Sequence, residues 1–553
     1  MTPNIDTLPA EIIDAIVSRL DDDDVMKLST TCRALRARTA HQVFHTVRFS
    51  NDPRIADAAL VAVKNHGIHV KVLRFVGFAG EEDDNPDVEP ALKPANRDIL
   101  PPSALILFEA NAALLPSLEQ FSISFDHDYD YVREFDCPHG PCMFEQPESW
   151  DMVHAREAKL TMCRLWANTY KALAGNKTAT GLVIENWSPR GVSTFQTPEW
   201  RAYLGRLKTL DIRITAARQA WSFTNSMTGY VKDIAKMQGL FFEHLNTVQT
   251  LKISIRPEIP FGMHGTHHIP LPIKPTGRMP ALQHLELSNL FISADLAAFI
   301  LSYKTQLRTV TLHNAQSAAA EYGECASQPL PWSAFFDALS LGLGEDESSF
   351  TLTQLTVTSP APLSETEAKS GRINYKTERA AIKQVRAELR ADSRRCLFGY
   401  GDLHGYHGYF AHDVKTNQQS AIEGVDQAAW DRLVAKLDAK RGYVVASKAV
   451  VVEAGGEEND TAWGGSDMPV SGLKTTTKKG RGAGSGKGSA ASSVEGGGGD
   501  SAEASKAGPA EAGTTVDVPI RITRRRRGQA DDAQRDQPRR SDRIAKMRGQ
   551  DSV

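Results

Sequence analysis

Cysteine and histidine side chains gather at a few places along the chain, and these are the residues that could bind a metal. Cys137, His139 and Cys142 lie close together, and His154 and Cys163 follow. A tetrahedral zinc site needs four such ligands, usually with paired Cys-x-x-Cys spacing, and that spacing is absent here. The pattern favours a polar loop over a zinc site, although zinc binding by Cys137 and Cys142 stays open. Two histidine groups in Pro-, Gly- or Tyr-rich stretches are more typical of polar surface: His264, His267, His268, His404, His407 and His412.

The sequence lacks the motifs of common catalytic sites. It has no G-x-x-x-x-G-K-[ST] phosphate loop, no G-x-S-x-G turn and no H-E-x-x-H helix. The glycine- and lysine-rich run at 479–488 has no strand and helix pattern around it, so it does not predict a nucleotide site. We therefore expect a protein that is not an enzyme and that needs no cofactor and no metal.

Size and charge narrow the class of protein. The chain has 553 residues, 41% of them hydrophobic, which suffices for a large core, and its formal net charge is −3. This balance argues against electrostatic attraction of the whole chain to nucleic acid or membranes. The sequence shows neither a secretory leader nor a run of about 18 apolar residues. We expect an intracellular protein, in the nucleus and/or the cytoplasm.

Residues 5–49 predict two short amphipathic helices and a third half-helix, with more apolar side chains than so small a unit can bury. Pro9 suits the first helical position, and Asp21 to Asp24 should end the first helix and cap the second. The apolar side of the second helix is predicted to run from Val25 to Leu35. The apolar residues of the first helix are Ile12, Ile13, Ile16, Val17 and Leu20, and the apolar residues of the second are Val25, Leu28, Cys32 and Leu35.

This stretch resembles an F-box, the helical module that binds the Skp adaptor of cullin-RING ubiquitin ligases. The similarity rests on the Leu8-Pro9 opening, the Glu11-Ile12-Ile13 start, the Val25–Leu28 centre, Cys32 and Phe44; Leu35 stands where the family commonly has a tryptophan. The resemblance implies an adaptor contact shared with the module's own core. It implies the contact residues Leu8, Pro9, Ile12, Ile13, Ile16, Leu20, Leu28, Cys32 and Leu35. An ordinary helical hairpin that caps the next domain is the alternative.

The next 400 residues repeat one pattern of the form L-x-x-L-x-L or a fragment of it. A strand, a helix and a strand are first predicted between Val47 and Phe75. The pattern then recurs at 118–123, 182–184, 207–212, 248–253, 282–287, 307–312 and 352–357, with spacings of 25 residues or more. Such spacing is typical of a leucine-rich repeat with insertions. We expect the bracketing residues to point inward and the strands to form a parallel sheet, as in a solenoid.

A compact α/β domain with parallel strands would show similar alternation and is the alternative fold. In either case the insertions at 80–102, 126–150 and 256–280 are predicted to be loops, which either border a partner site or are simply solvated. Helices are predicted at 377–396 and 427–437, on either side of Cys396–His412. The predicted fold class is therefore α/β, with an F-box at 1–46 and an irregular leucine-rich-repeat-like domain at 47–450.

From about residue 451 the composition changes to Gly, Ser, Ala, Lys and Glu, which predicts a disordered tail at 451–553. Two basic clusters in it suit a nuclear import signal or an electrostatic contact with nucleic acid, and a solvated charge run is the alternative. Their main residues are Arg524, Arg525, Arg526, Arg527, Arg539 and Arg540.

Together these patterns predict a substrate-recognition subunit of a Skp/cullin/F-box ubiquitin ligase, with an unknown protein client bound by the repeat domain. A nuclear scaffold or nucleic-acid-associated protein that acts through the arginine-rich tail is the second hypothesis, although nucleic acid is the less expected partner.

Overall fold

The computed structural model describes one part of the chain in detail. It covers residues 8–78, 98–109, 112–126, 149–215, 225, 227–265, 268–275, 278–318, 330–344, 347–364, 380–392, 395–403 and 410–448. The chain divides into two units, Met1–Glu457 and Glu458–Val553, and every described residue belongs to the first. The predicted tail therefore lies outside the described residues, as do most of the insertions at 80–102 and 126–150.

Three helices form the N-terminal module: α1 Ala10–Val17, α2 Asp22–Thr31 and α3 Arg33–Val43. Asp21 caps α2 as predicted, since its side chain accepts a hydrogen bond from the Asp24 amide at 2.8 Å. Two sequence-based predictions were wrong in detail. Pro9 is the N-cap of α1 rather than its first residue, and Cys32, with extended backbone, ends α2 and caps α3, so Leu35 belongs to the third helix.

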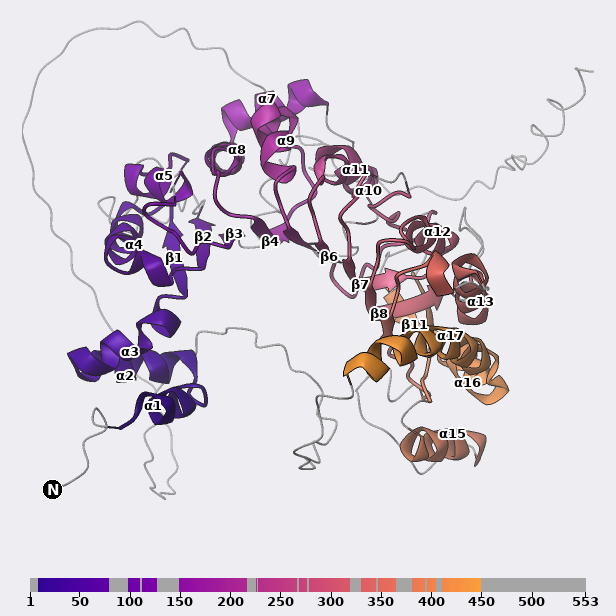
Figure 1. Cartoon of the computed structure of the whole chain (residues 1–553). Coiled ribbons are helices and arrows are strands. Elements are labelled where there is room, and N and C mark those ends of the chain that lie inside the picture. Colours follow the sequence, from indigo (N-terminus) through magenta and orange to yellow (C-terminus); the bar gives the residue numbers. More distant parts are fainter. Residues whose placement is uncertain are drawn as a thin grey trace, which may run out of the picture. The chain divides into compact units, whose positions relative to one another are not determined.

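The remainder is an α/β fold with a mostly parallel sheet, which confirms the predicted fold class at that level (Figure 1). Each strand from β1 to β8 pairs in parallel with the next strand in sequence, β9 and β10 both pair with β8, and β11 is antiparallel to β10. The strands are β1 Thr46–Ser50, β2 Val72–Phe78, β3 Gln120–Asp126, β4 Gly181–Trp187, β5 Thr209–Ile214, β6 Thr250–Ser254, β7 His284–Phe291, β8 Thr309–Ala318, β9 Gln354–Val357, β10 Gly399–Leu403 and β11 Phe410–His412.

Every predicted repeat coincides with a strand, because its apolar residues alternate with polar ones and only one face of the sheet is buried. The pairing register brings equivalent inward residues into line. One inward row continues from Phe49 through Phe75, Ile123, Ile184, Ile212, Ile253, Leu287 and Leu312. These side chains are at most 1% exposed and belong to one continuous hydrophobic core. The predicted inward positions, Leu285, Leu287, Val310 and Leu312 among them, are confirmed.

Helices between the strands cover the buried face of the sheet, and Figure 1 shows them on one side of the strands. Asp52 caps the first of them as the sequence predicts, accepting hydrogen bonds from the Arg54 and Ile55 amides. The connecting α-helices are α4 Pro53–His66, α5 Pro102–Phe108, α7 Trp150–Lys159, α8 Thr161–Ala174, α9 Pro198–Leu204, α10 Thr228–Ala235, α11 Met237–Leu240, α12 Ala294–Ser302 and α13 Trp332–Leu343. Short 3-10 turns are η2 Gly67–His69, η4 Ser193–Gln196, η6 Phe242–His244 and η7 Glu347–Ser349.

The C-terminal part of the first unit contains α15 Ala380–Ala391, α16 Val414–Glu423 and α17 Val425–Lys448. The helices α15 and α17 overlap the two predicted ones, α17 continues beyond residue 437, and α16 was not predicted. Asp426 of α17 joins this helix to β10 and α13, since its carboxylate accepts hydrogen bonds from the Tyr400 hydroxyl at 2.8 Å and the Ser333 amide at 2.9 Å. Trp332 of α13 donates its indole N–H to the Gly399 carbonyl at 2.9 Å. These contacts fix β10 and α17 against α13.

The segment between β6 and β7 has no helix or regular strand, as predicted for 256–280, but its described part is not simply solvated. Phe261 forms isolated bridges with Ile269 and Leu290, and Gly262 has φ 118° where a side chain would collide with the Phe291 carbonyl. Its apolar side chains are buried: Ile259, Phe261, Met263, Ile269, Leu271 and Ile273. The solvated-loop alternative is therefore wrong for this insertion, because the burial of these side chains holds the segment on the core.

Three asparagines within the strands have positive φ: Asn186 next to the end of β4, Asn289 near the end of β7 and Asn314 in the middle of β8, with φ of 53°, 63° and 50°. Asn289 and Asn314 occupy equivalent places on neighbouring strands, and the Asn314 side-chain amide donates to Asn289 Oδ1 at 2.5 Å. The Asn289 amide in turn donates to the Ile255 carbonyl on the preceding repeat. Asparagine tolerates this backbone conformation, and its side chain satisfies polar groups at the point where the strand bends.

Replacing Asn289 should separate these two effects. Asn289→Ala loses the side-chain hydrogen bonds and places an alanine in the left-handed region, so we expect a loss of about 2 to 4 kcal/mol of unfolding free energy. Asn289→Gly loses the same hydrogen bonds but relieves the backbone conflict, and should cost about 1 to 2 kcal/mol less. Denaturant unfolding measures both, with Ser288→Ala as the control. Equal losses for the alanine and glycine variants would refute a backbone contribution.

Candidate partner-binding surfaces

The N-terminal module has a small hydrophobic core of its own. Ile13, Val17, Val25 and Leu35 are buried together, with Ile13 and Leu35 only 2% exposed. Five further apolar residues pack against this core and stay partly exposed: Leu8, Leu20, Leu28, Cys32 and Val43. No residue beyond Val43 belongs to this cluster within the described ranges. The module therefore builds this core from its own residues, among the residues described.

The nine predicted adaptor-contact residues divide into three groups. Ile13 and Leu35 belong to the buried core, and Leu8, Ile16, Leu20, Leu28 and Cys32 are half-buried. Pro9 and Ile12 are exposed, the latter to 49%, and Met26 of α2 is exposed to 54% although it was not among the predicted residues. The outer apolar residues are thus available to a partner, while the inner ones hold the helices together.

Polar contacts fix the start and end of this module. The Arg38 guanidinium donates to the Leu8 carbonyl at 3.0 Å, which ties the segment before α1 to α3. Arg36 Nε donates to the Ser29 carbonyl at 3.3 Å and joins α3 to α2. At the end of α3, the Phe44 ring stacks on the His66 imidazole of α4 with centroids 3.8 Å apart. These contacts connect the module to the first repeat without using its outer apolar residues.

A second candidate surface is the face of the sheet opposite the helices. The register places one residue per strand in a polar row, which begins at Arg48 and continues through Arg74, Ser122, Val183, Asp211, Lys252, Glu286, Thr311 and Thr356. We call this row and the residues next to it on the same face the polar sheet face. The long side chains of this face are charged, whereas β3 and β4 carry the small side chains of Ser122 and Val183 in this row.

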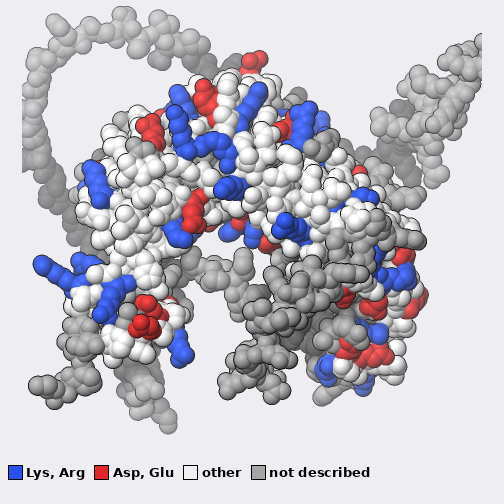
Figure 2. All heavy atoms as spheres, in the orientation of Figure 1, with Lys and Arg blue, Asp and Glu red and all other residues white. Residues whose placement is uncertain are grey.

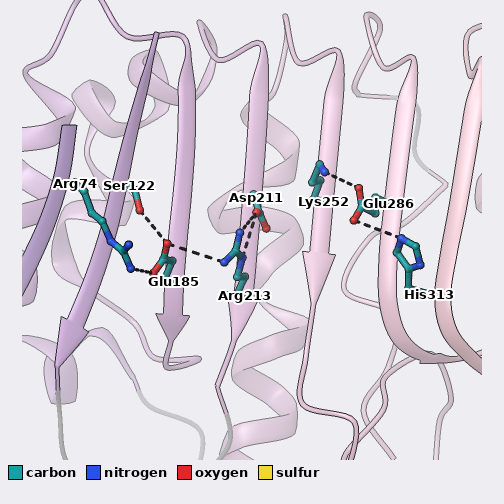
Figure 3. Close-up of polar contacts among 8 residues, drawn as sticks. All are labelled: Arg74, Ser122, Glu185, Asp211, Arg213, Lys252, Glu286 and His313. Carbon is teal, nitrogen blue, oxygen red and sulfur yellow. Dashed lines mark hydrogen bonds and ion pairs between the residues drawn. The ribbon is translucent and has the colours of Figure 1, made fainter. Parts of the chain in front are cut away.

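Two groups of ion pairs cross this face, and Figure 3 shows them in line over successive strands. Arg74 Nη2 lies 2.7 Å from Glu185 Oε2, reaching across β3 because Ser122 is small; the Ser122 hydroxyl donates to Glu185 Oε1 at 3.2 Å. Arg213 Nη2 lies 3.0 Å from Asp211 Oδ2 and its Nη1 lies 4.0 Å from Glu185 Oε1. Each carboxylate thus has a basic partner beside it.

The second group lies on β6 to β8. Lys252 Nζ lies 2.6 Å from Glu286 Oε2, and His313 Nε2 lies 3.7 Å from Glu286 Oε1. Over the wider surface, Figure 2 shows acidic and basic side chains interspersed on the side turned to the viewer. The polar sheet face follows this pattern in its composition, but its acids and bases differ in how far they are exposed.

The acidic side chains of the polar sheet face are shielded and the basic ones are not. Asp211, Glu185 and Glu286 are 17%, 20% and 33% exposed. Arg74, Lys252 and Arg213 are 42%, 44% and 52% exposed. Arg48 is exposed as well and has no acidic partner in the described part of the chain. The face therefore offers mainly cationic hydrogen-bond donors to solvent.

The cysteines and histidines considered as possible metal ligands are not brought together where they are described. Cys137, His139, Cys142, His267, His404 and His407 lie outside the described residues. Cys163 is buried in the core on α8, whereas His154 is exposed on α7. Among the described residues no group of three or more His, Cys, Asp or Glu side chains could hold a metal ion. The nuclear-signal arginines, Arg524 to Arg527, Arg539 and Arg540, also lie outside the described ranges.

A pocket of about 680 Å³ lies where β9 meets α17, lined by Leu355, Trp430 and Val434 together with Asp431 and Cys396. Burial and the neighbouring carboxylates of Asp431 and Asp392 raise the pKa of the Cys396 thiol. A raised pKa disfavours the thiolate, which is the nucleophilic form of cysteine. The chemistry of this pocket therefore does not favour nucleophilic catalysis by Cys396.

Asp402 and His268 form a mostly buried pair that pattern reasoning did not identify. His268 Nε2 lies 3.8 Å from Asp402 Oδ1, and the Leu403 amide donates to the same oxygen at 2.7 Å. Asp402 Oδ2 is buried and has no hydrogen-bond partner in the described structure. Burial raises the pKa of Asp402 to about 6. Asp402 lies on β10, whose sequence GYGDL has no alternation of apolar and polar residues, so no periodic signal marked it.

No protein-family model matches the sequence, and no curated protein is significantly similar to it. None of the described helices combines the length and the apolar composition that crossing a membrane requires. The function must therefore be inferred from the geometry of the two surfaces.

Asp402 should make stability depend on pH. Its pKa is raised from 3.8 to about 6, so the folded protein binds the proton more tightly than the unfolded chain does. The free energy of unfolding therefore falls as pH rises from 3.8 through about 6, and the ionised carboxylate weakens the fold above that pH. Asp402→Asn keeps an oxygen for the Leu403 amide and removes the buried charge. We expect the variant to gain about 1 to 3 kcal/mol at pH 7.5 and much less at pH 4.

Denaturant unfolding at the two pH values measures this difference. Asp57→Asn, which changes an exposed carboxylate on α4, is the control and should shift stability little at either pH. A destabilised Asp402→Asn variant at pH 7.5 would contradict the argument, since it would mean that the ionised carboxylate supports the fold.

Proposed function

We propose that this protein is a substrate receptor of a Skp/cullin/F-box ubiquitin ligase: its N-terminal module binds the Skp adaptor, and its repeat domain binds a protein client. The observation that carries the proposal is the N-terminal module itself. Three short helices bury a core of four residues, yet leave Ile12 and Met26 about half exposed. Exposed apolar side chains on so small a module are best explained by a partner.

The order of the strands in the sheet supports the proposal that the repeat domain binds a protein client. Strands that pair one after another in sequence, with inward apolar rows and asparagines at equivalent strand positions, are typical of an irregular leucine-rich-repeat-like solenoid. In such a domain the face opposite the helices is free for a partner. The polar sheet face is then the client surface, since its side chains are charged and its strands are not covered by the connecting helices.

Such a receptor acts by position rather than by chemistry. The adaptor joins the receptor to the cullin-RING ligase, and the repeat domain holds the client near the ubiquitin-charged enzyme of that ligase. Holding the acceptor lysine near the activated ubiquitin makes the transfer effectively unimolecular. This reading requires no catalytic residue and no cofactor in the chain, in line with the prediction from its motifs.

Adaptor binding should depend on the exposed apolar residues of the module. We expect Ile12→Asp and Met26→Asp each to weaken binding to a purified Skp adaptor at least tenfold, because a charge replaces an apolar contact in the interface. Both positions are about half exposed, so the fold should survive. Isothermal titration calorimetry with the full chain measures the affinity, and circular dichroism checks the fold.

Val61→Asp is the matched control, since Val61 is 58% exposed on α4, outside the module. Substitutions at Ile13 are unsuitable because that side chain is 2% exposed and its loss would unfold the module. Adaptor binding that is absent in the unmodified chain, or unchanged in both module variants, would refute the proposed function.

A further inference from the structure

We propose that the polar sheet face binds an extended peptide segment rich in Asp and Glu. This inference deepens the proposed function, on which it rests, by naming the chemistry of the client. It depends on which charges of the face are already satisfied within the protein and which are still available.

The acidic residues of the face are occupied. Glu185 uses one oxygen for Arg74 at 2.7 Å and the other for Ser122 at 3.2 Å. Glu286 uses one oxygen for Lys252 at 2.6 Å and has His313 3.7 Å from the other. These carboxylates, with Asp211, are the less exposed side chains of the face. They hold the basic side chains in place and are poor ligands for an incoming cation.

The basic residues keep donors for a partner. An arginine has five N–H donors and a lysine has three, and Arg74 and Lys252 each use one donor in these ion pairs. Arg74 Nε is buried, so the donors that Arg74 offers to a partner are those of its other guanidinium nitrogens. Arg213 directs Nε and Nη2 to Asp211, while Nη1 is 4.0 Å from Glu185, beyond hydrogen-bond distance. The Arg48 side chain is exposed and makes no polar contact with the described part of the chain. Four cations thus face three carboxylates, and the donors exceed the acceptors.

The exposed cations follow one another across the strands. Arg48 and Arg74 are directly opposite on β1 and β2, whereas Arg213 and Lys252 lie on β5 and β6. Arg74 and Arg213 extend toward each other over the strands between them, so both guanidinium groups lie beside Glu185 (Figure 3). An extended acidic segment that crosses the strands on this face would therefore pass these cations in turn.

An acidic peptide explains these features better than a polynucleotide does. A polynucleotide presents phosphates at every step, whereas the face alternates cation pairs with shielded carboxylates that would repel a continuous row of phosphates. An acidic peptide carries its charges on separate side chains, which can meet the exposed cations without facing the shielded carboxylates. Preferential binding of single-stranded RNA is the result that would count against the proposal.

The test uses the full chain and fluorescein-labelled peptides in anisotropy titrations. The probe is an eight-residue peptide, Glu-Glu-Gly-Ser-Gly-Ser-Glu-Glu, and its partner has Gln in place of each Glu. We expect measurable binding of the acidic peptide, at least tenfold weaker binding of the Gln peptide, and an affinity that falls as salt rises from 50 to 200 mM. Equal binding of both peptides, or no binding of the acidic one, would overturn the proposal.

Variants identify the surface. Arg48→Gln and Arg213→Gln should each weaken binding about three- to fivefold, the effect of one exposed ion pair. Arg54→Gln is the matched control, since Arg54 is an exposed arginine near Arg48 in sequence but belongs to α4, on the helical side. An equal loss in the control would refute the assignment to this face. Tighter binding of oligo(U) RNA than of the acidic peptide, lost in the same variants, would also overturn it.

The adaptor and the peptide are tested on the same chain, so the two proposals can fail separately. Ile12→Asp should abolish adaptor binding and leave the affinity for the acidic peptide unchanged. Adaptor binding without peptide binding overturns the inference about the client and leaves the receptor function. Peptide binding without adaptor binding overturns the receptor function and leaves an acidic-peptide-binding protein.

Discussion

The in-register pairing of each strand with the next strand in sequence is the constraint on which the structure depends. A backbone ladder begins where the Lys71 amide donates to the His45 carbonyl and continues through equivalent residues to the Thr353 amide and the Arg308 carbonyl. A slip of one residue in any pair would turn its apolar side chains to solvent and its charged ones to the core. The pairing therefore fixes the hydrophobic core and the polar sheet face together, because alternate residues of the same strands supply both.

That register also creates an electrostatic difficulty that the side chains resolve. Arg48 and Arg74 are directly opposite on neighbouring strands, and like charges in that position destabilise a sheet. Arg74 extends over Ser122 toward Glu185 instead, and Arg213 approaches the same carboxylate from the other side. A larger residue than serine on β3 would block this reach. The small side chain on β3 and the shielded acid on β4 are thus parts of one arrangement that keeps the cations exposed.

Most of the fold could be predicted from the sequence, because leucine, isoleucine and phenylalanine at period two report burial directly. Each repeat became a strand, and Asp21 and Asp52 capped the predicted helices. Two kinds of feature could not be predicted. Cys32 ends a helix although its spacing suits a continuous one, since backbone conformation at a single residue leaves no periodic trace. The ion pairs of the polar sheet face join strands 25 to more than 100 residues apart, and only the register shows which charges meet. The asparagines with positive φ did carry a signal, since Asn289 and Asn314 follow Leu287 and Leu312 at the same distance.

The energetics of the polar sheet face limit what electrostatics alone can achieve. An exposed ion pair contributes up to about 1 kcal/mol, so four cations supply up to about 4 kcal/mol, which corresponds to a dissociation constant of about 1 mM. Micromolar binding needs about 8 kcal/mol, so about half must come from other contacts. Val72 and Val183 are partly exposed on the same face, between and beside the cations. A client held at micromolar affinity would then place an apolar side chain between its acidic groups. Charge would select acidic segments, and the valines would select among them.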